Sequence, residues 1–318
     1  MGATHAEGLA RIPDVVLVGI VSPDRPAARR LARRLGTASF DSLREARRTA
    51  RADALWVCAP TVAHRSVVLE AAAAGLHVFC EKPLAASLRE ADAMLAGVRR
   101  AGVRFMVGHV LRFFPEFAAL RRMVRDGTLG ATGVIRMSRG GKYPQGYGNW
   151  YSNLLRSGGP LLDLVIHDFD WLRWTFGPVQ RVHARVSYGL KPVPQAYTLT
   201  LLRLAAGPLA HVEGFWGHDL PFRVGVEIAG SKGMAEYDSA SPAALTVQRA
   251  ASRQGRPAVA VPESPLALSP YEAEDRHFIE VIRAGSEPAV TGEDAYEAIR
   301  IGLAAASSAR SRKAVNLS

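Results

Sequence analysis

The sequence predicts an α/β protein of two domains: a doubly wound parallel sheet, followed by an α+β domain with a mainly antiparallel open sheet. From Val15 to about His109, short continuous apolar runs alternate with helical patterns, which is typical of parallel strands covered on both faces. After about residue 178 the apolar period changes to two, as in strands with one buried face. A length of 318 residues suits two domains of roughly 100–200 residues, which we place at 1–108 and 109–318.

The first domain is predicted from runs of four to seven apolar residues and from helices bounded by capping signals, such as Ser87 with Glu90 three positions later. The expected strands are Val15–Val21, Ala54–Ala59, Leu76–Cys80 and Val103–Gly108, and the expected helices are Ala3–Arg11, Arg25–Leu35, Leu43–Ala50, His64–Ala74 and Ser87–Ala101.

A doubly wound sheet of this kind should begin with a strand, a glycine-rich turn and a helix. Gly2 precedes a helical pattern, as the third glycine of the dinucleotide fingerprint would, and Ser22 stands 20 positions later, where a ribose-binding acid is usual. No strand precedes Gly2, although its absence would leave two strand edges unpaired inside the domain. We therefore expect an N-terminally truncated sequence, either because the start lies inside the real reading frame or because this copy is broken. In the first case, an upstream extension would supply the first strand and restore folding and cofactor binding.

The second domain is predicted as a sheet with helices on one face and water or a partner on the other. Its expected strands are Ala131–Arg139, Arg181–Val186, Tyr197–Leu204, Leu209–Trp216, Arg223–Gly230, Met234–Asp238 and Leu245–Gln248. Its expected helices are Glu116–Arg125, Leu161–Thr175, Glu272–Arg283 and Glu293–Arg310, with an aromatic loop at Gly140–Ser152 and a mobile loop at Ala250–Pro265.

Composition restricts the partners and the compartment. The net charge of +11 comes from arginines scattered through helices, with only five lysines among forty basic residues, so we expect no nucleic-acid partner. No apolar run approaches the ~20 residues of a membrane helix, and the N-terminus lacks a signal-peptide pattern. Cys58 and Cys80 each end an apolar run and are expected to be buried thiols, which indicates a cytoplasmic protein.

One apolar helix, Leu161–Thr175, carries polar residues on a single stripe. At about 100° per residue, Asp163, His167 and Asp170 fall within an arc of roughly 60°. This stripe is either a hydrogen-bonded seam or a catalytic group, since buried carboxylates and imidazoles are costly unless paired or used. Asp168 lies about 140° from Asp163 and is expected to be structural, and Asp170 to be a buried hydrogen-bond partner. A metal would need a third ligand that the sequence does not supply, so none is expected.

Several motifs together resemble one oxidoreductase family. They are Glu81-Lys82-Pro83 read with Ala59-Pro60-Thr61 and His64, the segment Gly108–Pro115, the pattern from Gly158-Gly159 through Asp163 to His167, and Thr291–Ala295 before the final helix. The set is similar to the glucose–fructose oxidoreductase, inositol dehydrogenase and rhizopine-catabolism (Gfo/Idh/MocA) family, and it covers almost the whole chain.

The resemblance implies the catalytic residues. In that family the lysine of Glu-Lys-Pro sits beside the nicotinamide, and the Asp and His of the buried helix point at the same place, which implies Lys82, Asp163 and His167 here. The residue types suit hydride transfer, since imidazole can take a hydroxyl proton and an ammonium can stabilise an alkoxide. The cofactor-binding residues are then expected to be Gly2, Ser22, Asp24, Arg25, Pro60, Thr61, His64, Glu81 and Lys82, and the substrate-binding residues His109, Arg112, Lys142, Trp150, Asp163 and His167.

The expected function is NAD(P)-dependent hydride transfer to or from a carbinol or carbonyl carbon of a polyol, sugar or sugar-nucleotide. The alternative is a non-catalytic binding or regulatory homologue that has lost the cofactor turn. The coenzyme is NAD or NADP, with a lean to NADP because Ser22 does not repel a 2′-phosphate and Arg25, Arg29 and Arg30 follow, although Asp24 pulls the other way. The resemblance also implies a homodimer or homotetramer formed through the open face of the second sheet.

Overall fold

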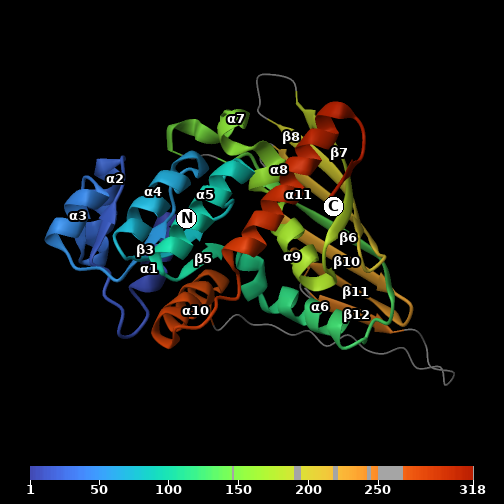
Figure 1. Cartoon of the computed structure of the whole chain (residues 1–318). Helices are drawn as coiled ribbons and strands as arrows, with labels where there is room; N and C mark the ends of the chain where they lie inside the picture. The colour runs from blue at the N-terminus through green and yellow to red at the C-terminus, as the bar shows by residue number, and fades with distance from the viewer. Residues whose placement is uncertain (145–146, 190–194, 218–220, 242–244, 250–267, 318) are drawn as a thin grey trace. The chain divides into compact units, whose positions relative to one another are not determined.

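The chain folds into two compact units, seen in a computed structural model that describes all residues except 145–146, 190–194, 218–220, 242–244, 250–267 and 318 (Figure 1). Unit 1 comprises Met1–Ala85, Arg89–Val110 and Leu268–Glu293, and unit 2 comprises Ala86–Leu88, Leu111–Ala267 and Asp294–Ser318. Apart from Ala86–Leu88, the chain passes from unit 1 to unit 2 after Val110, and Leu268–Glu293 returns to unit 1. The domain boundary after residue 108 stays a prediction. The loop predicted at Ala250–Pro265 lies outside the described residues.

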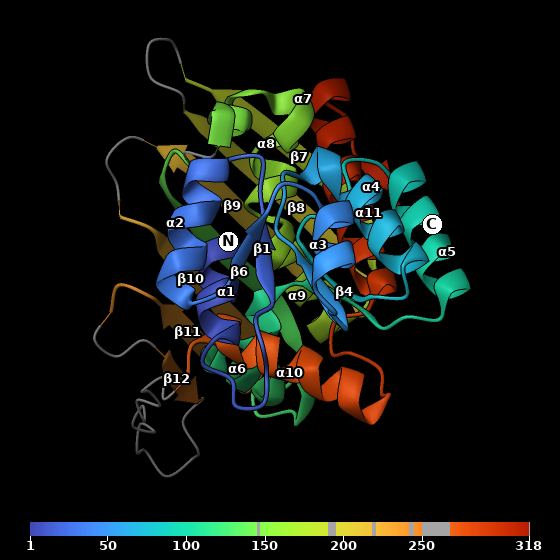
Figure 2. The same cartoon turned by 90° about the vertical axis from the view of Figure 1, so that its left-hand side faces the viewer.

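Unit 1 contains five parallel strands in two separate sheets. One sheet pairs β1 (Gly19–Val21) with β2 (Ala38–Phe40), and the other has the order β3 (Ala54–Val57), β4 (His77–Glu81), β5 (Phe105–Gly108). The helices of this unit are α1 (Gly2–Leu9), α2 (Arg25–Leu35), α3 (Leu43–Thr49), α4 (Thr61–Ala73), α5 (Leu88–Ala101) and α10 (Pro270–Ala284). Helices α2 and α3 pack on β1 and β2, and α10 packs on α1 (Figure 2).

The starts and ends of these helices follow from their sequence. Asp24 accepts a hydrogen bond from the backbone N–H of Ala27 at 3.0 Å and begins α2, which ends at Gly36 with a φ of 65°. Ser42 begins α3 in the same way, accepting from the N–H of Glu45 at 3.1 Å.

Two strands of unit 1 differ from the prediction. The strand expected from Val15 is limited to Gly19–Val21, and the short strand Ala38–Phe40 was not predicted. Among the described residues β1 and β3 do not pair with each other, so each has a strand neighbour on one side only. The expected strand upstream of Gly2 lies outside this chain and stays a prediction.

Unit 2 is built on one eight-stranded sheet with helices on one of its faces (Figure 1). The strand order is β12-β11-β10-β6-β9-β8-β7-β13, and all neighbours are antiparallel except β6 and β9. The strands are β6 (Thr132–Lys142), β7 (Val179–Tyr188), β8 (Ala196–Leu204), β9 (Leu209–Gly217), β10 (Arg223–Gly230), β11 (Gly233–Asp238), β12 (Leu245–Arg249) and β13 (Val315–Asn316).

The helical layer of unit 2 covers the apolar face of this sheet. It comprises α6 (Pro115–Arg125), α7 (Leu154–Ser157), α8 (Gly159–Asp163), α9 (Ile166–Phe176) and α11 (Gly292–Ser311), with 3-10 turns η1 (Val110–Phe113) and η2 (Tyr147–Ser152). Strand β8 shows the predicted alternation, since Thr198, Thr200 and Leu202 are buried while Tyr197 and Leu201 are exposed. No helix in the described part of the chain is long and apolar enough to cross a membrane.

The single helix predicted at Leu161–Thr175 is wrong, because the chain forms two helices, α8 and α9, with a break at Leu164–Val165. The backbone N–H groups of Leu164 and Val165 both donate to the carbonyl of Pro160, at 3.1 and 2.9 Å. The Val165 N–H thus bonds five residues back instead of four, which widens the turn and interrupts the regular helix. Val165 also packs closely on strand β9, where a Cβ placed on Gly214 would lie only 2.4 Å from its Cγ1. The 60° arc, which assumed one regular helix, does not extend across the break.

Candidate functional site

In unit 1 the predicted cofactor residues follow the carboxyl ends of parallel strands. Because β3, β4 and β5 are parallel, their ends share one edge of the sheet, where such folds bind ligands. Pro60 and Thr61 follow β3, Lys82 follows β4 and His109 follows β5. Lys82 is half-buried, whereas His109 is fully buried.

Glu81, the last residue of β4, belongs to a buried group of ionisable side chains that we call the His5 triad: His5, Glu81 and Asp275. His5 on α1 lies with Nε2 3.0 Å from Oε1 of Glu81 and Nδ1 2.7 Å from Oδ1 of Asp275 on α10. The other carboxylate oxygen of Glu81 accepts the backbone N–H of Lys82 at 3.0 Å. Sequence reasoning missed this triad, since His5 and Asp275 are 270 positions apart and neither stands in a motif.

His64 joins the ends of β3 and β4. Its ring is fully buried, with Nε2 2.8 Å from the carbonyl oxygen of Ala59 and Nδ1 3.0 Å from that of Pro83. Burial lowers the pKa of His64, although the hydrogen bonds to the surrounding carbonyl groups act to raise it. The structure therefore places His64 where it holds two loops of the predicted cofactor site together.

The predicted ribose residues stand together after β1. Oγ of Ser22 accepts the backbone N–H of Asp24 at 3.2 Å, and the Asp24 carboxylate caps α2. Arg25 begins α2 and pairs with Asp41 at 3.2 Å, with 60% of its side chain exposed. The Asp24 carboxylate is thus engaged by the backbone, whereas the Arg25 guanidinium is largely in solvent.

In unit 2, the predicted catalytic pair Asp163 and His167 flanks the break between α8 and α9. Asp163 is the last residue of α8 and is buried, and His167 is the second residue of α9 and is half-buried. The predicted substrate residue Lys142 is exposed at the end of β6, and the ring of Trp150 in η2 lies 4.2 Å from that of Tyr151.

Asp168 has the structural role that the sequence predicts. Its carboxylate accepts two hydrogen bonds from the Arg139 guanidinium of β6, both at 2.6 Å, and both side chains are buried. Burial raises the pKa of Asp168, while the facing Arg139 acts to lower it. The bidentate pair fixes α9 to the middle of the sheet.

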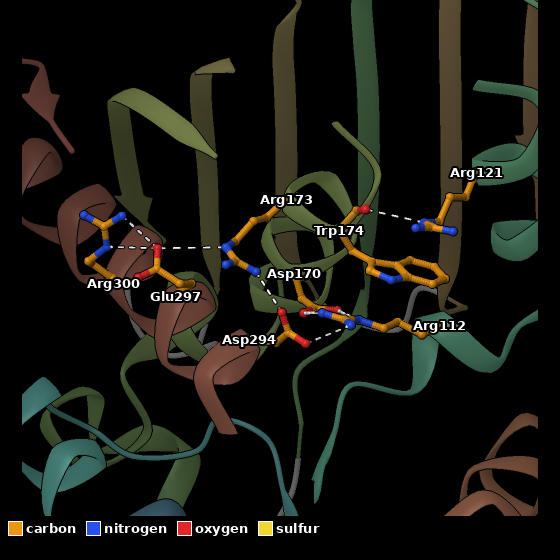
Figure 3. A network of polar contacts seen from close by, with 8 residues as sticks. All are labelled: Arg112, Arg121, Asp170, Arg173, Trp174, Asp294, Glu297 and Arg300. Carbon is orange, nitrogen blue, oxygen red and sulfur yellow. Dashed lines mark hydrogen bonds and ion pairs between the residues drawn. The ribbon is translucent and has the colours of Figure 1, made fainter. Parts of the chain in front are cut away.

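Asp170 is the buried hydrogen-bond partner that the sequence predicts, and its partner is Arg112 (Figure 3). Arg112 donates to the two Asp170 oxygens at 2.9 and 2.6 Å and to Asp294 of α11 at 3.1 Å. Arg173 donates to the other Asp294 oxygen at 2.8 Å. The Arg112 guanidinium, which was expected to bind substrate, is only 2% exposed and lies inside this ion network. Its part in substrate binding stays a prediction.

Further polar contacts extend this network along α11 and connect α9 with α6 (Figure 3). Glu297 lies 3.9 Å from Arg173 and accepts from Arg300 at 2.7 Å, while the Arg121 guanidinium stacks 3.9 Å from the centre of the Trp174 ring. These contacts join α6, α9 and α11 of unit 2, so the helix that carries His167 is tied to its neighbours.

The described residues fit a dinucleotide in unit 1. Helices α1 and α4 begin without an acidic residue in the first turn, and among the described residues no side chain caps either start. A Cβ on Gly2 would lie 3.6 Å from Cβ of Cys58, so α1 begins beside the end of β3. Helix starts that carry no negative charge suit phosphate groups. The described part of the chain has no group of three His, Cys, Asp or Glu residues that could hold a metal ion.

A parallel sheet with uncharged helix starts and a lysine at its carboxyl edge is typical of one class of protein, the dinucleotide-binding oxidoreductases. Residues 1–109 match a family described as an oxidoreductase family with an NAD-binding Rossmann fold, and residues 117–236 match the GFO/IDH/MocA C-terminal domain. The chain belongs to the Gfo/Idh/MocA family of oxidoreductases, which confirms the resemblance, the α/β fold and the assignment as an enzyme acting on CH–OH groups.

Its relatives include dehydrogenases of cyclic polyols. The chain is 29% identical to a myo-inositol 2-dehydrogenase of Thermotoga maritima, covering 100% of this chain and 96% of that protein. It is 31% identical to the uncharacterized oxidoreductase YrbE of Bacillus subtilis, covering 80% and 74%. Levoglucosan dehydrogenase, solved with NADH and L-sorbose, shares the fold with a TM-score of 0.88 and 22% identity, covering 100% and 96%.

Proposed function

We propose that this chain is an NAD(P)-dependent dehydrogenase or reductase of a carbinol or carbonyl carbon in a polyol, sugar or sugar-nucleotide. The observation that carries the proposal is the position of Lys82, directly after β4 at the carboxyl edge of the NAD-binding unit, with its backbone held by Glu81. The names of the inositol dehydrogenase relatives support the substrate class. The non-catalytic alternative is not favoured, because the residues of the catalytic motif are all present.

Each proposed catalytic residue has a role suited to its chemistry. When bound, the nicotinamide accepts or supplies the hydride. His167 takes the hydroxyl proton, the Lys82 ammonium stabilises the negative charge on that oxygen, and Asp163 orients the imidazole or a neighbouring hydroxyl. The backbone N–H groups at Gly2 and Thr61 are proposed to hold the pyrophosphate, and Lys142 and Trp150 to contact the substrate.

His167→Asn is expected to lower kcat by about 10²–10³-fold while changing substrate affinity only a few-fold. The reason is that asparagine keeps a hydrogen-bonding group but cannot accept a proton near neutral pH. The measurement is coenzyme reduction at saturating polyol, after a screen of inositols and aldoses has identified the substrate.

His183→Asn on β7, a histidine of the same unit outside the proposed site, serves as the matched control and should keep wild-type kcat. A His167→Asn enzyme with wild-type kcat would remove His167 from the mechanism. If no polyol, sugar or sugar-nucleotide reduces either coenzyme, the proposed function itself is wrong.

NADP is expected to bind at least as tightly as NAD. The Asp24 carboxylate accepts a backbone N–H, and the neutral Ser22 and the largely exposed Arg25 stand beside it in the sequence, so a 2′-phosphate would have a hydroxyl and a guanidinium as partners. Titration of tryptophan fluorescence with both coenzymes measures the preference, and Ser22→Asp should shift it toward NAD. A clear preference of the wild-type chain for NAD would refute this assignment.

We also propose a cytoplasmic homodimer or homotetramer. Cys58 and Cys80 are both free thiols, as expected in a reducing compartment. The face of the sheet away from the helices exposes apolar side chains on neighbouring strands, with Val134 directly opposite Leu209 and with Tyr197 and Leu201 on β8. A second copy of the chain would cover this face. A monomer in sedimentation equilibrium would contradict the proposal.

A further inference from the structure

We propose that His5 and Asp275 are positioning residues for Lys82, acting through Glu81. The inference rests on the proposed role of Lys82, and it adds two residues that stand outside the catalytic motifs. The three side chains come from α1, the end of β4 and α10, and all of them lie within unit 1.

The His5 triad is almost completely buried. The side chain of His5 is 1% exposed, that of Glu81 7% and that of Asp275 0%. The His5 ring packs 5.0 Å from the ring of Phe79 and 6.1 Å from that of Tyr271. Water is therefore largely excluded from the triad, and its polar atoms can find partners only within the protein.

The His5 ring is an imidazolium at neutral pH. Burial alone would lower its pKa, but the hydrogen bonds to Asp275 and Glu81 together with the negative charges of these carboxylates raise the pKa to about 10. Both ring nitrogens can then donate, one to each carboxylate. Burial acts to raise the pKa of Glu81, but the hydrogen bond from His5, together with the positive charges of His5 and Lys82, lowers it. Glu81 is therefore the ionised partner of His5.

Asp275 fixes the imidazolium from the opposite side. Its Oδ1 accepts from Nδ1 of His5 at 2.7 Å and from the indole Nε1 of Trp56 at 2.8 Å. Its Oδ2 has no hydrogen-bond partner among the described residues, and burial raises the pKa of this carboxyl group. Oδ2 lies against Gly8 of α1, where an added Cβ would come within 2.8 Å of it.

Glu81 links the position of His5 to that of Lys82, because its two carboxylate oxygens accept from different partners. Oε1 is held by His5, and Oε2 accepts the backbone N–H of Lys82 at 3.0 Å. Without the imidazolium, a buried carboxylate would lose its charged donor and would turn or take up a proton. The main-chain position from which the Lys82 side chain extends would then be less defined. Catalysis is sensitive to such a change, since a misplacement of about 1 Å can cost 10²-fold.

The experiment compares His5→Gln with wild type. A glutamine amide can donate to one carboxylate but turns its oxygen toward the other, so kcat should fall by about 10- to 100-fold while the KM for coenzyme changes less than about threefold. Asp275→Asn keeps an acceptor for His5 and Trp56 and should retain most of kcat, whereas Asp275→Leu should behave like His5→Gln. Arg11→Gln is the matched control: it removes the Arg11–Glu272 ion pair between the end of α1 and α10 without touching Glu81, and kcat should not change.

A second measurement does not depend on turnover. In ¹⁵N-labelled protein, the amide proton of Lys82 should resonate downfield, as expected for a bond to a carboxylate, and it should move upfield in His5→Gln but not in Arg11→Gln. The proposal is overturned if His5→Gln keeps wild-type kcat, or if the Lys82 amide signal is unchanged in that variant. A Lys82→Ala enzyme that keeps its turnover would instead refute the proposed role of Lys82, and the amide measurement would still test the positioning.

Discussion

Lys82→Ala is expected to abolish measurable turnover while leaving unit 1 folded. The side chain is half-buried directly after β4, and its backbone N–H bonds to Glu81, a contact that alanine retains. The substitution removes the cation beside the oxygen that gains negative charge, and with it any part that Lys82 takes in proton transfer. Such groups each contribute about 10²–10⁴-fold to the rate. The measurement is kcat on the identified substrate, with coenzyme affinity followed by fluorescence.

Lys232→Ala is the matched control, because Lys232 lies in the turn between β10 and β11 of unit 2. It should keep wild-type kcat and stability. The mechanism proposed for Lys82 fails if purified Lys82→Ala shows the same kcat as the control.

Arg112→Leu is expected to lower the free energy of unfolding of unit 2 by about 3–5 kcal/mol, because it leaves Asp170 as a buried charge without its partner. The Asp170 side chain is 1% exposed, and both of its oxygens accept from Arg112. Urea unfolding followed by tryptophan fluorescence measures the change, since Trp171 and Trp174 lie on α9 itself. The double variant Arg112→Leu/Asp170→Leu should recover much of the loss, because no unpaired charge remains.

Arg223→Leu offers a matched comparison. Arg223 and Asp238 form the same kind of two-bonded arginine–carboxylate pair in unit 2, but 62% of the arginine side chain is exposed. Removing it should change stability little, since solvent screens exposed pairs. Equal losses in Arg112→Leu and Arg223→Leu would show that burial does not determine the effect.

The elements that the sequence predicts best have local signals at both ends. Helix α2 begins and ends where predicted because Asp24 caps its start and Gly36 ends it. The strand Ala38–Phe40 has only three residues, too few for a periodic pattern. At the break, Leu164–Val165, Val165 packs closely against Gly214, about fifty positions away in sequence, and no local pattern reveals such a contact.

The candidate site also has residues that the sequence predicts and partners that it does not. Lys82, Asp163 and His167 could be named from motifs, and the sequence also predicts that Asp168 is structural and that Asp170 is a buried hydrogen-bond partner. Their partners, Arg139 and Arg112, could not be predicted, because each pairing joins segments brought together only by the fold. The two carboxylates that accept hydrogen bonds from Arg112, Asp170 and Asp294, could not be predicted either, and the part of Arg112 in substrate binding stays a prediction.

Unit 1 is assembled from segments that lie far apart in the sequence, and this affects when it can fold during synthesis. Its sheet strands come from the first 110 residues, but α10 belongs to Leu268–Glu293. That helix supplies Asp275 to His5, and Phe278, whose ring lies 5.5 Å from Trp56 and 6.0 Å from Phe79. At about 5–20 residues per second, a ribosome needs about 10–40 s for the roughly 190 residues between Glu81 and Asp275. During that interval the nascent unit has a histidine and two aromatic side chains without the helix that covers them, and a chaperone that binds exposed aromatic surface has time to act.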